Sequence, residues 1–156
     1  MNGRLLSIQI SNGGVPKRPI AFARVTEQGL EGDRQRDLRY HGGPLRAVSL
    51  YSAEAIEALR AEGHPIAPGS AGENLTILGL EWARLSLGDR LSFQGGVELE
   101  LTSLAAPCRK LKHCFLGGAF TRISAEKHPG WSRFYAKVLS PGLLVTGGEL
   151  KWRSAS

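Results

Sequence analysis

Twenty glycines in a chain of 156 residues constrain most strongly what it can fold into. This is about twice the average share, and glycine favours turns and close backbone approaches over long helices. Between the glycines lie short segments in which apolar and polar residues alternate, as in Leu6 to Ile10 and Val97 to Leu101. Strict alternation is typical of half-buried strands. The pattern predicts a mostly β barrel with one or two short helices.

The expected elements can be placed by residue range. We expect strands at Arg4–Ile10, Ile20–Thr26, Arg46–Tyr51, Asn74–Leu78, Arg90–Phe93, Val97–Thr102, Ala136–Leu139, Leu143–Thr146 and Leu150–Trp152. Ser52 is a suitable N-cap for a helix over Ala53–Glu62, which Gly63 would end. A second short helix is expected around Leu111–Leu116.

Length and composition favour a single domain over residues 1–156, long enough to bury a core. No apolar run approaches the roughly 20 residues that span a bilayer, and the first residues show no secretory signal pattern. The two cysteines, Cys108 and Cys114, are better explained as reduced thiols than as a disulfide. We therefore expect a cytoplasmic protein with no membrane partner.

Charge is distributed unevenly along the chain, whose formal net charge is +6. Residues 1–50 carry +4, residues 51–105 carry −5 and residues 106–156 carry +7. If the two ends fold beside each other, they build one positive face for an anionic ligand. An unevenly charged solvated surface is the alternative. A basic nucleic-acid-binding barrel is less favoured, because aromatic residues make up only 7% and do not alternate with the cations.

Cys108 is the strongest candidate for chemistry. Arg109 and Lys110 follow it directly, and nearby cations favour a thiolate, which is both a nucleophile and a soft metal ligand. The alternative is a small buried side chain. Cys114 precedes Phe115 and is better explained as packing.

Several familiar sites are not favoured by the residue spacing. A zinc site at Cys108, His113 and Cys114 lacks paired Cys-x-x-Cys spacing and an obvious fourth ligand. The chain contains no Gly-x-Ser-x-Gly, no Gly-x-x-x-x-Gly-Lys and no Gly-x-Gly-x-x-Gly. Hydrolase, P-loop and Rossmann functions are therefore not supported.

Three polar segments, of which the first two bear glycines, fall at the ends of expected strands. They are Gly29-Leu30-Glu31-Gly32-Asp33 continuing to His41-Gly42-Gly43-Pro44, then Gly72-Glu73-Asn74-Leu75, and finally Pro107-Cys108-Arg109-Lys110. Together with Leu87-Gly88-Asp89-Arg90, and in this order, they resemble the MOSC domain, named for the carboxy-terminal domain of molybdenum-cofactor sulfurase. The resemblance covers nearly the whole chain.

The resemblance implies a small, mostly antiparallel β-barrel that binds a molybdenum–pterin cofactor (Mo-molybdopterin). It implies that Cys108 is the protein ligand of molybdenum or a sulfur carrier. Small stand-alone bacterial members of the family resemble reductases of N-hydroxylated compounds, including an N-hydroxylated base. The chain contains no fused electron-transfer module, so electrons would come from a separate reductase protein.

The residues and the resemblance together assign the candidate site. We expect Cys108, Glu73 and His41 to be catalytic, with Cys108 as the metal ligand. We expect the cofactor to be bound by Arg39, His41, Gly42, Gly43, Arg46, Gly72, Asn74, Arg109 and Lys110. Backbone N–H groups near Gly43 and cations such as Arg46 would hold the phosphate. We also expect His41, Glu73 and Cys108 to face one pocket.

Two departures from the family pattern and one rival function remain. Leu45 stands where many members carry an acidic residue, which bears on substrate preference, and Gly147-Gly148-Glu149 replaces Gly-Asp in a turn. The rival within the family is a sulfur-carrier or cofactor-delivery domain that uses a Cys108 persulfide.

Overall fold

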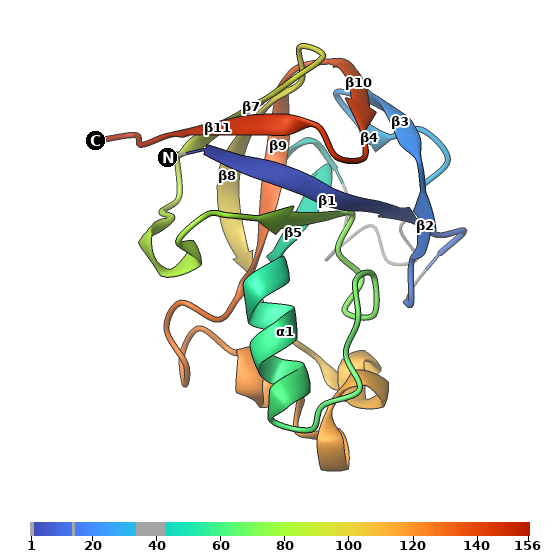
Figure 1. Ribbon diagram of the computed structural model, residues 1–156, viewed down its shortest axis with the longest axis vertical. Helices are drawn as coiled ribbons and strands as arrows, with labels where there is room; N and C mark the ends of the chain where they lie inside the picture. Colours follow the sequence, from blue (N-terminus) through green and yellow to red (C-terminus); the bar gives the residue numbers. More distant parts are fainter. Residues whose placement is uncertain (1, 14, 34–42) are drawn as a thin grey trace.

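Seven strands form a closed barrel in the structure, a computed structural model that describes residues 2–13, 15–33 and 43–156 (Figure 1). The strands follow the order β11-β7-β8-β9-β5-β6-β1, and β1 pairs with β11 to close the barrel. Their bounds are β1 (Asn2–Ile10), β5 (Val48–Ser52), β6 (Leu75–Leu78), β7 (Arg90–Phe93), β8 (Glu98–Ala105), β9 (Arg133–Ser140) and β11 (Glu149–Arg153).

Four further strands lie beside the barrel. The strand β2 (Arg18–Ile20) pairs with the end of β1. A separate three-stranded sheet consists of β10 (Gly142–Val145), β3 (Phe22–Thr26) and β4 (Gly29–Leu30). This small sheet lies at the upper right in Figure 1.

The mostly antiparallel barrel expected from the sequence is confirmed, with one refinement. Among the described strands, β5 and β6 alone pair in parallel, with Leu50 beside Leu75. Parallel neighbours need a crossover connection, and here it contains the helix α1 (Ala53–Ala61). The helix begins where expected, because the Ser52 hydroxyl accepts a hydrogen bond of 3.0 Å from the Ala55 backbone N–H.

Short helices lie with α1 at one end of the barrel (Figure 1). The 3-10 helices η3 (Arg109–Cys114), η4 (Leu116–Gly118) and η5 (Phe120–Ile123) follow β8, whereas η1 (Pro44–Arg46) and η2 (Trp82–Arg84) lie in loops between strands. Arg122 joins η5 to the end of α1 through two hydrogen bonds to Glu62, of 2.9 and 2.8 Å. None of the described helices has the length and apolar character needed to cross a membrane.

Alternating side chains on the strands produce one continuous hydrophobic core. Along β8, Leu99 and Leu101 are buried, whereas Glu100 between them meets Lys137 of β9 at 3.2 Å. Each fully buried leucine stabilises the fold by roughly 1.5–3 kcal/mol relative to an exposed one. The other fully buried side chains include Leu5, Ile8, Leu50, Leu75, Ile77 and Leu91.

The differences from the expected elements have local causes. The strand expected over residues 20–26 is divided into β2 and β3, which pair with different partners. The strands β8 and β9 are longer than expected, because each accommodates an irregularity in register and continues past it. The helix expected around residues 111–116 begins at Arg109 and is a 3-10 helix.

The N-cap of α1 leads to a first prediction. Replacing Ser52 with alanine removes the side-chain acceptor for the Ala55 N–H, which should lower the free energy of unfolding by about 0.5–2 kcal/mol. Urea denaturation measures the change. Ser92→Ala on β7 is the control and should change stability by less than about 0.5 kcal/mol. Equal effects of the two substitutions would contradict the capping role.

Candidate functional site

Cys108 lies exposed at the corner between β8 and η3. It occupies the N-cap position of η3, but its side chain makes no capping hydrogen bond. Arg109 and Lys110 follow it on the surface and are also exposed. An exposed, unpaired thiol beside two cations can act as a nucleophile or as a soft metal ligand. The structure therefore excludes the alternative that Cys108 is a buried packing residue.

Cys114 has a contrasting environment only six residues along the chain. It is fully buried, and its thiol donates to the Leu111 carbonyl at 3.2 Å. Burial raises the pKa of the Cys114 thiol to about 11. A thiol in this state is a poor nucleophile, so the expectation of a packing role is confirmed.

Tyr135 on β9 was not identified from the sequence. The Arg46 guanidinium lies over its ring, 5.4 Å from the centroid. Burial raises the pKa of Tyr135. The charges of Arg133 and Arg46 oppose this shift, and the charge of Cys108 adds to it. Arg46 therefore contacts Tyr135 on β9, and Cys108 is near enough for its charge to act on the same side chain. No pattern in the sequence distinguishes this tyrosine from its strand neighbours.

Asn74 connects the two glycine-bearing segments inside the protein. Its amide nitrogen donates to the Gln9 carbonyl at 3.1 Å and to Asp33 Oδ2 at 3.0 Å, and its amide oxygen accepts from the Ser49 backbone N–H at 3.1 Å. Asp33 in turn forms a buried ion pair with Lys17, at 2.6 Å. Because these contacts use the amide fully, Asn74 acts on the site by fixing the position of its segment.

Glu73 is fully buried and so does not lie on the exposed surface that carries Cys108. One carboxylate oxygen accepts a hydrogen bond of 3.4 Å from Thr76, and the other, Oε1, has no partner among the described residues. Burial raises the pKa of Glu73 to about 7, against the opposing effects of backbone hydrogen bonds and of the Arg133 charge. The carboxyl can therefore hold a proton close to neutral pH.

Two of the predicted glycines adopt conformations that other residues rarely take. Gly43, the N-cap of η1, has a φ of 78°, and a Cβ there would meet nothing within 4 Å. Gly72 has a φ of +83°, and a Cβ would lie 2.6 Å from a Val15 methyl group. Gly43 thus leaves its backbone open to an approaching group, whereas Gly72 permits close packing. Arg39, His41 and Gly42 lie outside the described residues.

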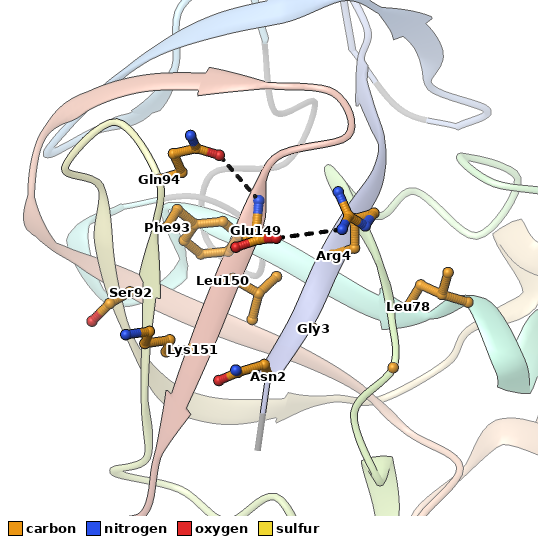
Figure 2. A pocket seen from close by; sticks show the side chains of 11 residues that line it. Asn2, Gly3, Arg4, Leu78, Ser92, Phe93, Gln94, Glu149, Leu150 and Lys151 are labelled. Carbon is orange, nitrogen blue, oxygen red and sulfur yellow. Dashed lines mark hydrogen bonds and ion pairs between the residues drawn. The ribbon is translucent and has the colours of Figure 1, made fainter.

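A hollow lined by described residues is separate from these groups (Figure 2). It has a volume of about 680 Å³ and lies between β1, β6, β7 and β11. Arg4 and Glu149 form an ion pair of 3.5 Å across it, and Lys151 lies nearby. It contains no cysteine or histidine, and no cluster of three His, Cys, Asp or Glu side chains suited to a metal occurs in residues 2–13, 15–33 and 43–156. Cys108 therefore remains the candidate centre.

The burial of Glu73 leads to a prediction about stability and pH. Between pH 4.5 and about 7 the unfolded chain releases this proton while the folded protein keeps it, so the free energy of unfolding falls as pH rises. A pKa difference of one unit corresponds to ~1.4 kcal/mol. The free energy of unfolding of Glu73→Gln should therefore rise relative to that of the wild type by roughly 2–3 kcal/mol between pH 5 and pH 8.

Denaturant titrations across this pH range measure the difference. Glu57→Gln, an exposed position on α1, is the matched control and should follow the wild type throughout. A constant difference between Glu73→Gln and the wild type from pH 5 to pH 8 would show that Glu73 does not titrate in this range.

Comparisons with known proteins agree with the fold. The MOSC domain model matches residues 37–151. The chain is 33% identical over 143 residues to the uncharacterized protein YflK of Bacillus subtilis (strain 168), an alignment that covers 88% of this chain and 62% of YflK. It is also 33% identical over 148 residues to protein YiiM of Escherichia coli (strain K12), covering 86% of this chain and 64% of YiiM. The chain thus spans less than two thirds of either relative.

Solved structures show the same barrel. The YUAD protein from Bacillus subtilis superposes with a TM-score of 0.80 over 100% of this chain and 98% of that one, at 19% identity, which shows a shared fold. YiiM from Geobacillus stearothermophilus gives a TM-score of 0.77 at 26% identity, over 97% of this chain and 75% of that one. The family model covers most of the chain, and a third of the aligned residues are shared with two relatives. The chain therefore belongs to the MOSC domain family.

Proposed function

We propose that the protein binds a molybdenum–pterin cofactor at Cys108 and reduces N-hydroxylated compounds such as N-hydroxylated bases. The observation that carries the proposal is the exposed Cys108 thiol, which makes no capping bond and is followed by two exposed cations. A thiolate is a soft ligand of the kind that transition metals bind. The family match supports a cofactor of this class.

The residues around Cys108 fit an anionic cofactor. Arg109 and Lys110 follow the thiol, and Arg46 reaches the same region over the Tyr135 ring. These cations would hold the phosphate of the cofactor, together with backbone N–H groups near Gly43. Arg39, His41 and Gly42 keep their proposed roles in cofactor binding, and His41 also keeps its proposed catalytic role. When bound, the cofactor supplies the two-electron redox chemistry.

The proposed reaction breaks an N–O bond and forms an N–H bond. The substrate takes up two electrons and two protons, and the oxygen leaves as water. A separate electron-donor protein would supply the electrons. Glu73 would hold a proton near neutral pH from within the protein, as its raised pKa of about 7 permits.

The same thiol supports a second function, that of a sulfur carrier or cofactor-delivery domain in which Cys108 bears a persulfide. An exposed cysteine that forms no disulfide suits that role equally well. Turnover separates the two functions, since a carrier binds without reducing an N-hydroxylated base.

We place the protein in the cytoplasm, where two unpaired thiols stay reduced.

The decisive experiment uses protein produced in a host that makes the cofactor. Molybdenum and pterin contents are measured first, and reduction of an N-hydroxylated base is then followed with a chemical electron donor. A loaded protein that turns the base over supports the reductase, and a loaded protein without turnover supports the carrier. Protein that retains neither molybdenum nor pterin under these conditions would refute both functions.

Replacing each of the two cysteines with serine gives a matched prediction. Cys108→Ser should abolish molybdenum retention and reduction, because a serine hydroxyl is a poor substitute for a soft thiolate, while the exposed site lets the fold persist. Cys114→Ser should keep molybdenum retention and reduction. Its free energy of unfolding should fall by roughly 1–3 kcal/mol, because the site is buried. Metal analysis, rate and melting temperature are measured for both. A Cys108→Ser protein that keeps its molybdenum and rate would disprove the proposed ligand.

Arg46 yields a second prediction for the cofactor. A charge-assisted hydrogen bond contributes roughly 1.5–3 kcal/mol, so Arg46→Ala should weaken cofactor retention by about 10- to 100-fold. Arg46→Lys, which keeps the charge, should recover part of the loss. Arg84→Ala removes a cation that lies over Trp152 instead, 5.6 Å from its ring, and serves as the control. Equal retention in Arg46→Ala and the control would rule out Arg46 as a phosphate ligand.

A further inference from the structure

Arg133 is a buried cation at the start of β9, with only 6% of its surface exposed. One of its terminal nitrogens, Nη1, donates to the Ala71 carbonyl at 2.7 Å. The other, Nη2, donates to the carbonyls of Ala105 and Ala106 at 3.3 and 3.4 Å. A single planar guanidinium therefore holds backbone oxygens from two separate segments.

These two segments are the ones that carry the candidate site. Ala71 comes directly before Gly72-Glu73-Asn74, and Ala106 comes directly before Pro107-Cys108. Arg133 also pairs with Ala105 in the β8–β9 ladder, so its backbone is fixed to the same corner that its side chain contacts. The Arg133 side chain thus joins the glutamate segment to the Cys108 corner directly.

Burying the charge of Arg133 costs free energy unless polar contacts compensate for it. None of the ion pairs between described residues includes Arg133, and its Nε atom has no hydrogen-bond partner there. A buried charge without a carboxylate partner is a weak contributor to stability, and an apolar side chain of similar size is often as favourable. An apolar side chain cannot replace the hydrogen bonds that the guanidinium donates to three carbonyls.

We propose that Arg133 is a positioning residue that holds the Gly72–Asn74 segment and the Cys108 corner at the separation the cofactor requires. The effect of Arg133 on cofactor retention rests on the proposed function. The coupling between the two segments can be measured in protein without cofactor. Lysine keeps the charge but has one nitrogen in place of the two that reach Ala71 and Ala105–Ala106. Arg133→Lys is therefore the diagnostic variant, and Arg133→Met removes the charge as well.

The first experiment measures amide hydrogen exchange in the full-length protein without cofactor. The Gly72 N–H, bonded to the Gly69 carbonyl, reports on one segment, and the Leu111 N–H, bonded to the Cys108 carbonyl, reports on the other. In Arg133→Lys both should exchange faster by about tenfold or more, while amides of β7 and β11 keep their wild-type rates. Unchanged rates at both reporters, or an increase shared by all strands, would overturn the inference.

Arg122→Lys is the matched control, since Arg122 also packs partly buried in the same region but binds Glu62 and lies over Trp131, 4.1 Å from its ring. It should leave the Gly72 and Leu111 reporters unchanged. The second experiment compares molybdenum and pterin retention, which should fall about tenfold or more in Arg133→Lys and stay at the wild-type level in Arg122→Lys at similar melting temperature.

The outcomes separate the two proposals. Faster exchange at both reporters with undiminished cofactor retention would overturn the positioning role, although the two segments would still be coupled. If the wild-type protein retains no molybdenum or pterin, the proposed function fails, and the exchange data alone then decide whether Arg133 couples the segments. Should Arg133→Met fail to fold, Arg133→Lys still provides both measurements.

Discussion

Pairing between the two ends of the chain closes the barrel, and the other contacts depend on this closure. Asn2, Gly3 and Arg4 lie opposite Lys151, Leu150 and Glu149, and the Leu5 N–H donates to the Gly148 carbonyl at 2.8 Å. Closure leaves β1 and β11 without the open edge that a flat sheet would have, and it lets Leu5 and Leu150 join one core. The loops that carry the candidate site are then attached to a rigid support.

Polar side chains inside the protein connect the segments that the barrel alone does not hold together. Asn74 joins its own segment to β1 and to Asp33, and Arg133 joins the neighbouring residues to the corner before Cys108. Hydrogen bonds of this kind add little net stability compared with apolar packing, but they specify geometry, because a buried polar group left without its partner is costly. The arrangement of the site depends on them more than the fold does.

The two cysteines show how environment decides chemistry. Both lie in or beside η3, yet Cys108 is exposed beside two cations, whereas Cys114 is buried and its pKa is raised to about 11. The difference arises from position on a short helix packed against the protein, so that one thiol faces solvent and the other the core. Glu73 and Tyr135 follow the same rule, since burial raises the pKa of each.

By itself the sequence determined the strands with regular alternation, the N-cap at Ser52 and the glycine turns. Each of these depends on neighbours within a few residues: Arg90–Phe93 is a strand at the expected bounds, and Ser52 caps the helix that follows it. Only the tertiary structure decided that β5 and β6 pair in parallel, that Glu73 is enclosed, and that Arg133 spans two loops. Strand partners, burial and long-range hydrogen bonds depend on residues far apart in the chain, and no local pattern encodes which of them meet.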